Sequence, residues 1–122
     1  MMRVLDGNQF LVRSFLGESD KWHHMPLSRA LLERLRREGF AGATVVHGVA
    51  GFGASSVIHT ANLMELSADL PVLIEVVDDE AHVEQLLPIL DEMVTGGALV
   101  TVERVRVVRY AAGENRPKAS AT

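Results

Sequence analysis

The pattern of hydrophobic and polar residues divides the first half of the chain into short segments of two kinds. Residues 9–16 are apolar on both alternating sets of positions, which favours a strand covered on both faces. A helix is predicted from Pro26, which suits a first turn, to Gly39, which suits a C-terminal stop. Its apolar residues recur at helical spacing: Leu27, Ala30, Leu31 and Leu35. Residues 43–49 and 57–66 then predict two strands of a hairpin.

The second half of the chain predicts a central strand, a helix and a last strand. Residues 72–77 form a near-continuous apolar run, typical of a strand inside a sheet. Asp78 or Asp79 can cap the helix that follows, in which Pro88 is expected to cause a kink or break. The apolar face of this helix comprises Val83, Leu86, Leu87, Leu90 and Met93. Thr95-Gly96-Gly97 ends it, and residues 99–110 predict the last strand or two short ones.

With the hairpin strand over 57–66 set apart, the order is strand, helix, strand, strand, helix, strand, which predicts an α+β protein with the ferredoxin-like βαββαβ plan. In that plan an antiparallel sheet carries both helices on one face. Because the strands are apolar on both sets of positions, we expect the second face to be buried between subunits of a homo-oligomer. The predicted organisation is a flexible N-terminus over residues 1–8, one domain over 9–110 and a mobile tail over 111–122.

Composition narrows the class of protein. The chain has 122 residues, enough for one domain with a real core. Twelve basic and 16 acidic residues give a net charge of −4, so no basic field for nucleic acid is expected. The absence of cysteine excludes disulfides and thiolate metal sites and suits the cytosol. With neither a signal-peptide pattern nor an apolar run long enough to span a membrane, the sequence predicts a cytoplasmic protein.

The most distinctive stretch is residues 48–60, which holds three of the ten glycines within six residues and then two serines. Glycine allows positive φ angles and a close approach of a ligand to the backbone. Serine hydroxyls beside exposed amides can hold an anion. The stretch therefore has two interpretations, a plain connection between strands and the wall of a ligand site.

Two charged features also have two interpretations each. Glu75 is one acid within the apolar run at 72–77, and burial of an unpaired carboxylate is costly. It needs a partner, which could be Arg106 or Arg109, backbone amides or a ligand. Arg104, Arg106 and Arg109 on the last strand are either solvated charges at a strand edge or a clamp for phosphate, which the forked guanidinium suits.

Catalysis and metal binding have less support. No G-x-S-x-G elbow or other known nucleophile pattern is present, so an enzyme is not expected. Asp78-Asp79-Glu80 fits a helix N-terminus, where negative charge is favourable. His47 and His59 could meet across a hairpin and bind a metal, although no HExxH or HxH spacing occurs. Trp22 either caps the edge of the core or stacks on a ring.

Several motifs resemble the nitrogen-regulatory PII proteins. The similarity lies at Val49-Ala50-Gly51-Phe52-Gly53, at residues 70–77, at Thr95-Gly96-Gly97 and at the arginines Arg106 and Arg109. The chain is more similar to an uncharacterised PII-like family, domain of unknown function 190. The motifs that carry this resemblance run in one order from about residue 10 to 110: Gly17-Glu18-Ser19-Asp20-Lys21-Trp22, Gly42-Ala43-Thr44-Val45, Gly51-Phe52-Gly53-Ala54, Ile58-His59-Thr60-Ala61, Leu66-Ser67-Ala68-Asp69-Leu70-Pro71 and Leu87-Pro88-Ile89-Leu90-Asp91-Glu92-Met93.

The resemblance implies a ferredoxin-like homotrimer that binds an adenine nucleotide in each cleft between subunits. It assigns the loop base near the phosphates to Gly51, Phe52, Gly53, Ala54 and Ser55. Glu75 and Val77 would lie near the base or ribose, and Gly96 and Gly97 would offer backbone amides. Arg106 and Arg109 would reach the phosphates from the neighbouring chain. No tightly bound cofactor is implied.

Departures from PII narrow this expectation. Ala54 and Ser55 replace an arginine and a glutamine that helps to hold magnesium, so ADP or AMP is favoured over magnesium–ATP. Val72 replaces the lysine that pairs with 2-oxoglutarate, and the long T-loop is missing. His47 and Ser56 also depart from residues common in the closer family.

The predicted function is a PII-like signalling protein that relays nucleotide binding to an unidentified partner protein, of which a membrane transporter or channel is one class. The alternatives are a divalent-metal-handling trimer of the same fold and a purely structural trimer.

Overall fold

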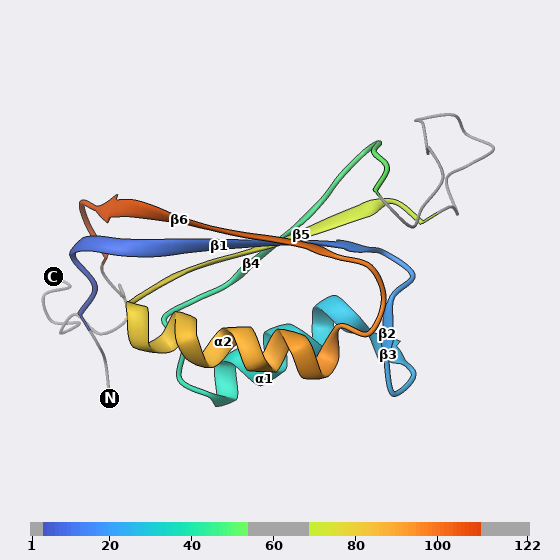
Figure 1. Ribbon diagram of the computed structural model, residues 1–122, viewed down its shortest axis with the longest axis horizontal. Helices are drawn as coiled ribbons and strands as arrows, with labels where there is room; N and C mark the ends of the chain where they lie inside the picture. Colours follow the sequence, from blue (N-terminus) through green and yellow to red (C-terminus); the bar gives the residue numbers. More distant parts are fainter. Residues whose placement is uncertain (1–3, 54–68, 111–122) are drawn as a thin grey trace, which may run out of the picture.

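A four-stranded antiparallel sheet with two helices on one of its faces forms the fold of the computed structural model, which describes residues 4–53 and 69–110 (Figure 1). The strands are β1 (Gly7–Gly17), β4 (Thr44–His47), β5 (Pro71–Asp78) and β6 (Leu99–Val107). The helices are α1 (Leu27–Arg37) and α2 (Glu80–Met93). A small hairpin, β2 (Lys21–Trp22) with β3 (Met25–Pro26), separates β1 from α1.

The sheet order is β4-β5-β1-β6, and every neighbouring pair is antiparallel. This arrangement confirms the predicted α+β, ferredoxin-like plan with both helices on one face. The strand expected over residues 57–66 lies outside the described residues. Within the described part, β4 pairs with β5, with Val46 opposite Leu73.

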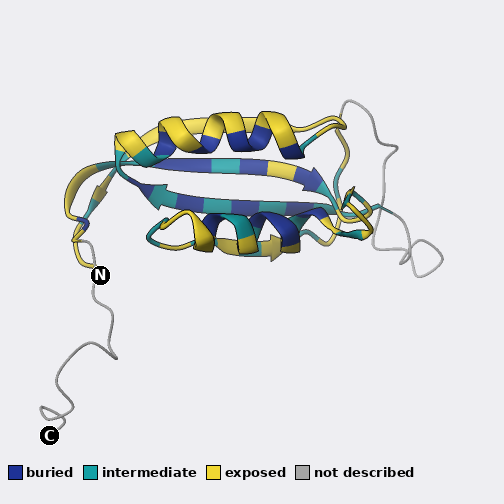
Figure 2. Cartoon of the chain, turned by 90° about the horizontal axis from the view of Figure 1, so that it is seen from below, coloured by how far each residue is buried: buried dark blue, intermediate teal, exposed yellow. Residues whose placement is uncertain are grey.

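The core lies between the sheet and the helices. Along β5 burial alternates strictly: Val72, Ile74 and Val76 are almost inaccessible, while the residues between them are half-buried (Figure 2). Val12 of β1 is fully buried in the same layer, and α1 adds Leu27, Ala30, Leu31 and Leu35. These are the four positions that the helical spacing predicts.

Both helices end near the predicted residues, and Pro88 does not break α2, so that part of the prediction is wrong. Gly39 has a φ of 84°, the left-handed conformation of a helix stop. Helix α2 continues through Pro88 without a break. Because proline has no N–H, the carbonyl oxygen of Glu84 loses its helical hydrogen bond. Glu84 and Pro88 are both exposed, so water can satisfy that oxygen. Among the described residues, no helix is long and apolar enough to span a membrane.

No helix of the described residues covers the other face of the sheet, and one line of apolar side chains crosses this face. We call Val46, Leu73, Phe15 and Leu99 the apolar row, because the pairing register places them side by side on four successive strands. Val46 is 45% exposed, Phe15 36% and Leu99 58%. A polar line follows on the same face, from Thr44 through Glu75 and Arg13 to Thr101.

If another copy of the chain covers the apolar row, Leu99→Glu will shift the protein to smaller species without unfolding it. Leu99 is already more than half exposed, so a charge there costs little within one chain. Leu87→Glu is the matched control, because Leu87 is 42% exposed on α2, away from the open face. Analytical ultracentrifugation at micromolar concentration measures the change. An unchanged sedimentation profile for Leu99→Glu would contradict the expectation.

The turn between β2 and β3 places two histidines in the left-handed region, with φ of 47° at His23 and 72° at His24. Residues with a Cβ pay roughly 1–2 kcal/mol in this conformation. The ring of His23 stacks on Trp22, with centroids 4.3 Å apart and planes within 9°. Glycine is the residue that such hairpin turns favour.

We therefore expect His24→Gly to stabilise the protein by about 0.5–1 kcal/mol, because relief of the backbone strain exceeds the entropy that glycine adds to the unfolded chain. Thermal or urea unfolding measures the gain. His24→Ala retains the Cβ and serves as the control, with no comparable gain. Equal midpoints for the glycine variant and the parent would show that the turn is not strained.

Candidate functional site

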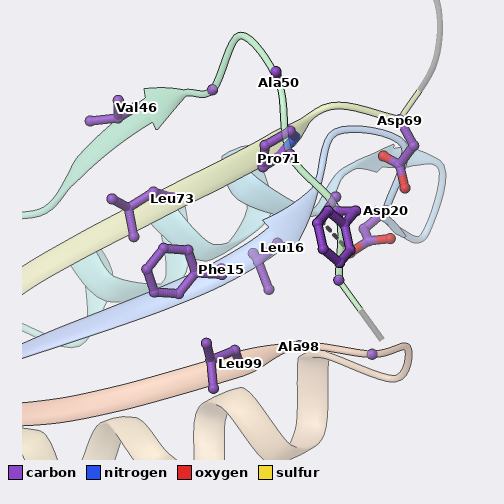
Figure 3. Close-up of a pocket in the computed structure, with 16 residues that line it drawn as sticks. Phe15, Leu16, Asp20, Val46, Ala50, Asp69, Pro71, Leu73, Ala98 and Leu99 are labelled. Carbon is purple, nitrogen blue, oxygen red and sulfur yellow. Dashed lines mark hydrogen bonds between the residues drawn. The ribbon is translucent and has the colours of Figure 1, made fainter. Parts of the chain in front are cut away.

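A pocket of about 700 Å³ lies on the open face of the sheet, at the end where β4 and β1 finish and β5 begins (Figure 3). Its floor is the whole apolar row together with Leu16. One wall is the glycine-containing loop from Gly48 to Gly53, and the other is Gly97 with Ala98 before β6. Segments distant in the sequence thus converge on one cavity.

The glycines of the loop have a role in packing that the sequence does not reveal. The amide of Gly48 donates to the carbonyl oxygen of Pro71 at 2.8 Å, which brings the loop against the first residue of β5. A Cβ built on Gly48 would lie 2.7 Å from Cγ of Pro71, and one on Gly51 would lie 2.9 Å from the same atom. The rigid proline ring cannot easily move aside, so these two glycines allow the loop to pack closely on Pro71.

Two carboxylates occupy one end of the pocket, and both hold the turn after β1. Oδ2 of Asp20 accepts a hydrogen bond from the amide of Gly17 at 3.0 Å. Oδ1 of Asp69 accepts one from the amide of Ser19 at 2.8 Å. Figure 3 shows Asp20 and Asp69 together at this end, with Phe15, Leu73 and Leu99 toward the other. The pocket is therefore apolar over the sheet and acidic near the loops.

The structure brings together four of the residues predicted from the resemblance: Gly51, Phe52, Gly53 and Gly97 all line the pocket. Ala54 and Ser55 lie outside the described residues. Gly96 is adjacent to Gly97 but is not part of the lining. Glu75 and Val77 face the same side of the sheet as the apolar row, further along β5.

Arg106 and Arg109 lie at the opposite end of β6 from the pocket. Arg106 pairs in register with Asn8, whereas Leu99 at the pocket pairs with Phe15. Seven residues of strand separate Leu99 from Arg106, roughly 23 Å at 3.3 Å per residue. Within one chain these arginines cannot contact a ligand in the pocket.

Glu75 has a partner that the sequence did not indicate. The proposed internal pairing with Arg106 or Arg109 is wrong, because the carboxylate binds Arg13, its direct neighbour on β1, with Nε–Oε2 at 2.9 Å. Arg13 also binds Glu103 at 3.0 Å. The hydrogen bond to Glu75 is the largest cause that raises the pKa of Arg13. Glu75 is also half-buried rather than enclosed, since odd positions of β5 face the open side.

The pocket lacks any positive side chain within the part of the chain that is described. Its lining contains two aspartates and no lysine, arginine or histidine. Sequence reasoning missed both aspartates and the apolar row as site residues. Phe15 and Leu73 could have been found from the alternation of strand positions, but Asp20 and Asp69 reach the pocket only through the packing of two loops.

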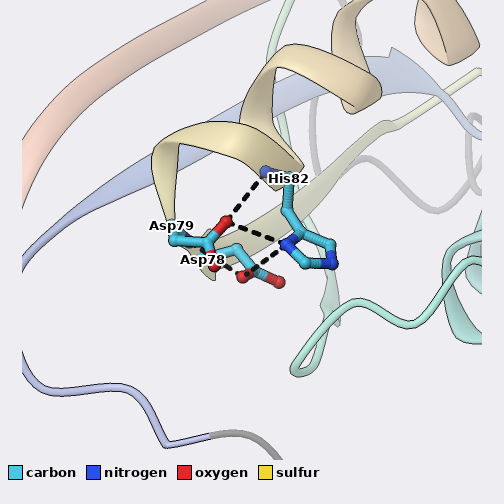
Figure 4. Close-up of side chains that lie close together, drawn as sticks. All are labelled: Asp78, Asp79 and His82. Atoms are coloured by element: carbon cyan, nitrogen blue, oxygen red, sulfur yellow. Dashed lines mark hydrogen bonds and ion pairs between the residues drawn. The ribbon is translucent and has the colours of Figure 1, made fainter.

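A second group of polar side chains, Asp78, Asp79 and His82, lies at the far end of β5 (Figure 4). Asp79 caps α2 by accepting from the amide of His82 at 2.8 Å, which confirms the predicted helix N-terminus. Asp78 is fully buried and accepts from the amides of Ala41 and Asp79, each at 2.8 Å. Tyr110 donates its hydroxyl to the carbonyl oxygen of Ala41 at 3.0 Å. These contacts give the group a structural role, because they join Ala41, the end of β5 and the start of α2.

The histidine pair predicted as a metal site can be placed only in part. His47 is exposed at the end of β4, and its Nδ1 lies 3.8 Å from Oε2 of Glu18. His59 lies outside the described residues, so the structure does not test this pair.

The chain belongs to the DUF190 family, described as Uncharacterized ACR, COG1993, whose model matches residues 9–107. A UPF0166 protein of Aquifex aeolicus is 34% identical over 107 residues, covering 88% of this chain and 98% of the relative. A UPF0166 protein of Methanocaldococcus jannaschii is 32% identical over 99 residues, covering 81% and 91%. The predicted family is thereby confirmed.

Solved structures share the PII-like fold. A protein of Thermus thermophilus described as PII-like and signalling superposes with a TM-score of 0.61 at 21% identity, covering 86% of this chain and 95% of the other. CPII of Thiomonas intermedia, bound to ADP and bicarbonate, gives a TM-score of 0.60 at 23% identity, covering 84% and 90%. At these identities the likeness establishes the fold.

The contact of the loop with Pro71 predicts that Gly48→Ala destabilises the protein by about 1–3 kcal/mol, because the new methyl group overlaps the proline ring. Adding Pro71→Ala should recover part of this loss, so the two changes will not be additive. Gly42→Ala is the control, since a Cβ there meets nothing within 4 Å. Urea unfolding of the parent, Gly48→Ala, Pro71→Ala and the double variant gives the coupling. Additive losses would show that the contact is not the cause.

Proposed function

We propose that this protein is a PII-like regulator that assembles as a trimer and binds an adenine nucleotide, ADP or AMP in preference to magnesium–ATP. Binding alters a surface that a partner protein recognises, and a membrane transporter or channel is one class of partner. The proposal assigns the protein a regulatory rather than a catalytic role.

One observation carries the proposal: the glycine-containing loop and the apolar row form a single pocket of about 700 Å³ in a PII-like fold. Its size is within the range of pockets that hold small ligands. A structural neighbour of the same fold, CPII, is bound to ADP and bicarbonate in one structure and to ADP, AMP and bicarbonate in another. The apolar floor suits the face of a purine ring.

The negative charge of the pocket supports a site that is completed by a second copy of the chain. A nucleotide carries negative phosphates, yet the described lining offers two carboxylates and no cation. Arg106 and Arg109 are the candidates for neutralising the phosphates. Because they lie at the end of β6 opposite the pocket of their own chain, they can reach the phosphates only in the pocket of a neighbouring copy. The proposed site therefore comprises Gly51, Phe52, Gly53, Ala54, Ser55, Glu75, Val77, Gly96 and Gly97 of one chain with Arg106 and Arg109 of the next.

The shift of a partner-binding surface requires a ligand that binds one state of the loop better than another. The loop at 51–56, with the tail after Tyr110, is the proposed surface. Ala54 and Ser55 lack the charge and the magnesium-binding amide of the PII residues, so a triphosphate gains little here over a diphosphate.

Isothermal titration calorimetry with ADP, AMP, ATP and cyclic nucleotides tests the binding. We expect heat with ADP and AMP and weaker binding of magnesium–ATP. Absence of heat with every nucleotide at millimolar concentration would refute the proposed function. Elemental analysis of the purified protein tests the alternative of a divalent-metal-handling trimer.

Mixed assemblies test whether the site is shared between chains. Phe52→Ala should weaken ADP binding from the loop side, and the double variant Arg106→Ala with Arg109→Ala should weaken it from the arginine side. The two variants are mixed, unfolded and refolded together, so that their subunits assemble with one another. Some interfaces then combine an intact loop from one chain with intact arginines from the next, and ADP binding should partly return. If the mixture binds no better than either variant, the loop and the arginines do not complete one another across an interface.

A further inference from the structure

We propose that Asp20 and Asp69 bind the ribose of the nucleotide through its 2′- and 3′-hydroxyls and make the pocket specific for ribonucleotides. The inference rests on the proposed function and names the residues that read the sugar. It differs from the resemblance, which suggests Glu75 for the base or ribose.

Each of the two carboxylates has one oxygen occupied and one available. Oδ2 of Asp20 and Oδ1 of Asp69 accept backbone amides of the turn after β1. Neither Oδ1 of Asp20 nor Oδ2 of Asp69 accepts a hydrogen bond from the described part of the chain. The backbone bonds fix both side chains in place, so the available oxygens are positioned before a ligand arrives.

Gly17 brings the two carboxylates close together. Its amide binds Asp20, and a Cβ built on it would lie 2.5 Å from Oδ2 of Asp69. Any larger residue at position 17 would displace Asp69. Two carboxylates near one glycine offer acceptors for a pair of adjacent hydroxyls, and Asp or Glu is the residue that hydrogen-bonds the ribose 2′-hydroxyl in dinucleotide-binding folds.

Among the described residues, no other group near the pocket offers the same chemistry. Glu75 is bound by Arg13 at 2.9 Å and lies outside the lining. The remaining lining residues are glycine, proline, alanine or apolar. Because ionised carboxylates only accept hydrogen bonds, they attract hydroxyl donors and repel phosphate oxygens.

The arrangement within the pocket also fits the order of groups in a nucleotide. The apolar row lies toward one end and the two aspartates toward the other (Figure 3). With the purine ring over Phe15 and Leu73, the attached ribose comes next, at the acidic end. The phosphates then extend past the carboxylates and out of the described lining, where a neighbouring chain can supply cations.

The test compares ADP with 2′-deoxy-ADP and 3′-deoxy-ADP by calorimetry on the assembled full-length protein. Loss of one hydroxyl bonded to a carboxylate should weaken binding about ten- to a hundredfold. In Asp20→Asn and Asp69→Asn the amide retains an oxygen for the backbone bond but loses the second acceptor. Each variant should bind ADP more weakly than the parent protein does. In each variant the preference for ADP over the deoxy analogues should also fall to about threefold or less. Asp91→Asn, an exposed change on α2, is the control and should retain the full preference.

Equal affinity of the parent protein for ADP and both deoxy analogues would overturn the inference and leave the proposed function intact. A preference that survives in both asparagine variants would assign the ribose to other residues. A uniform gain in affinity for all nucleotides in the variants would mean that the carboxylates act only by repulsion of phosphate. If circular dichroism shows that one variant does not fold, the test uses the other variant and the preference of the parent protein for ADP over the deoxy analogues. No binding of any nucleotide would refute both proposals together.

Discussion

The antiparallel pairing of β1 with β5 determines where every other part of the molecule lies. Because paired residues share a face, the register places Val12 and Val76 together against the helices and Phe15 and Leu73 together on the open side. A slip of one residue would exchange these two sets. The core, the apolar row and the pocket floor are therefore consequences of the same pairing.

That pairing also explains how charge is distributed on the open face. Arg13 lies opposite Glu75 and also binds Glu103 of β6, so one guanidinium lies between two carboxylates and the group keeps a net charge of −1. Exposed ion pairs contribute little to stability, and their effect here is to give both carboxylates a cationic neighbour on the open face. A face whose charged side chains are ion-paired and that carries a continuous apolar line is suited to contact with another protein surface.

The sequence predicted the fold well and the site only in part. Helical spacing identified the buried residues of α1, and the apolar run at 72–77 identified β5, because both patterns record burial directly. The GFG loop was also found at the pocket. Asp20 and Asp69 were missed, since their proximity depends on how the turn after β1 meets the residue before β5. The partner of Glu75 was misassigned because it depends on register between strands 62 residues apart.

The junction at Ala41 shows how a residue in a connection can be as constrained as one in the sheet. Its amide is held by the buried Asp78 and its carbonyl oxygen by Tyr110, so both backbone polar groups are occupied although the residue belongs to neither α1 nor β4. In hydrogen exchange, this amide should open only when the end of β5 or α2 opens. Tyr110, which follows β6, is thereby tied through Ala41 to the end of β5, and displacement of Tyr110 would be transmitted to the same junction.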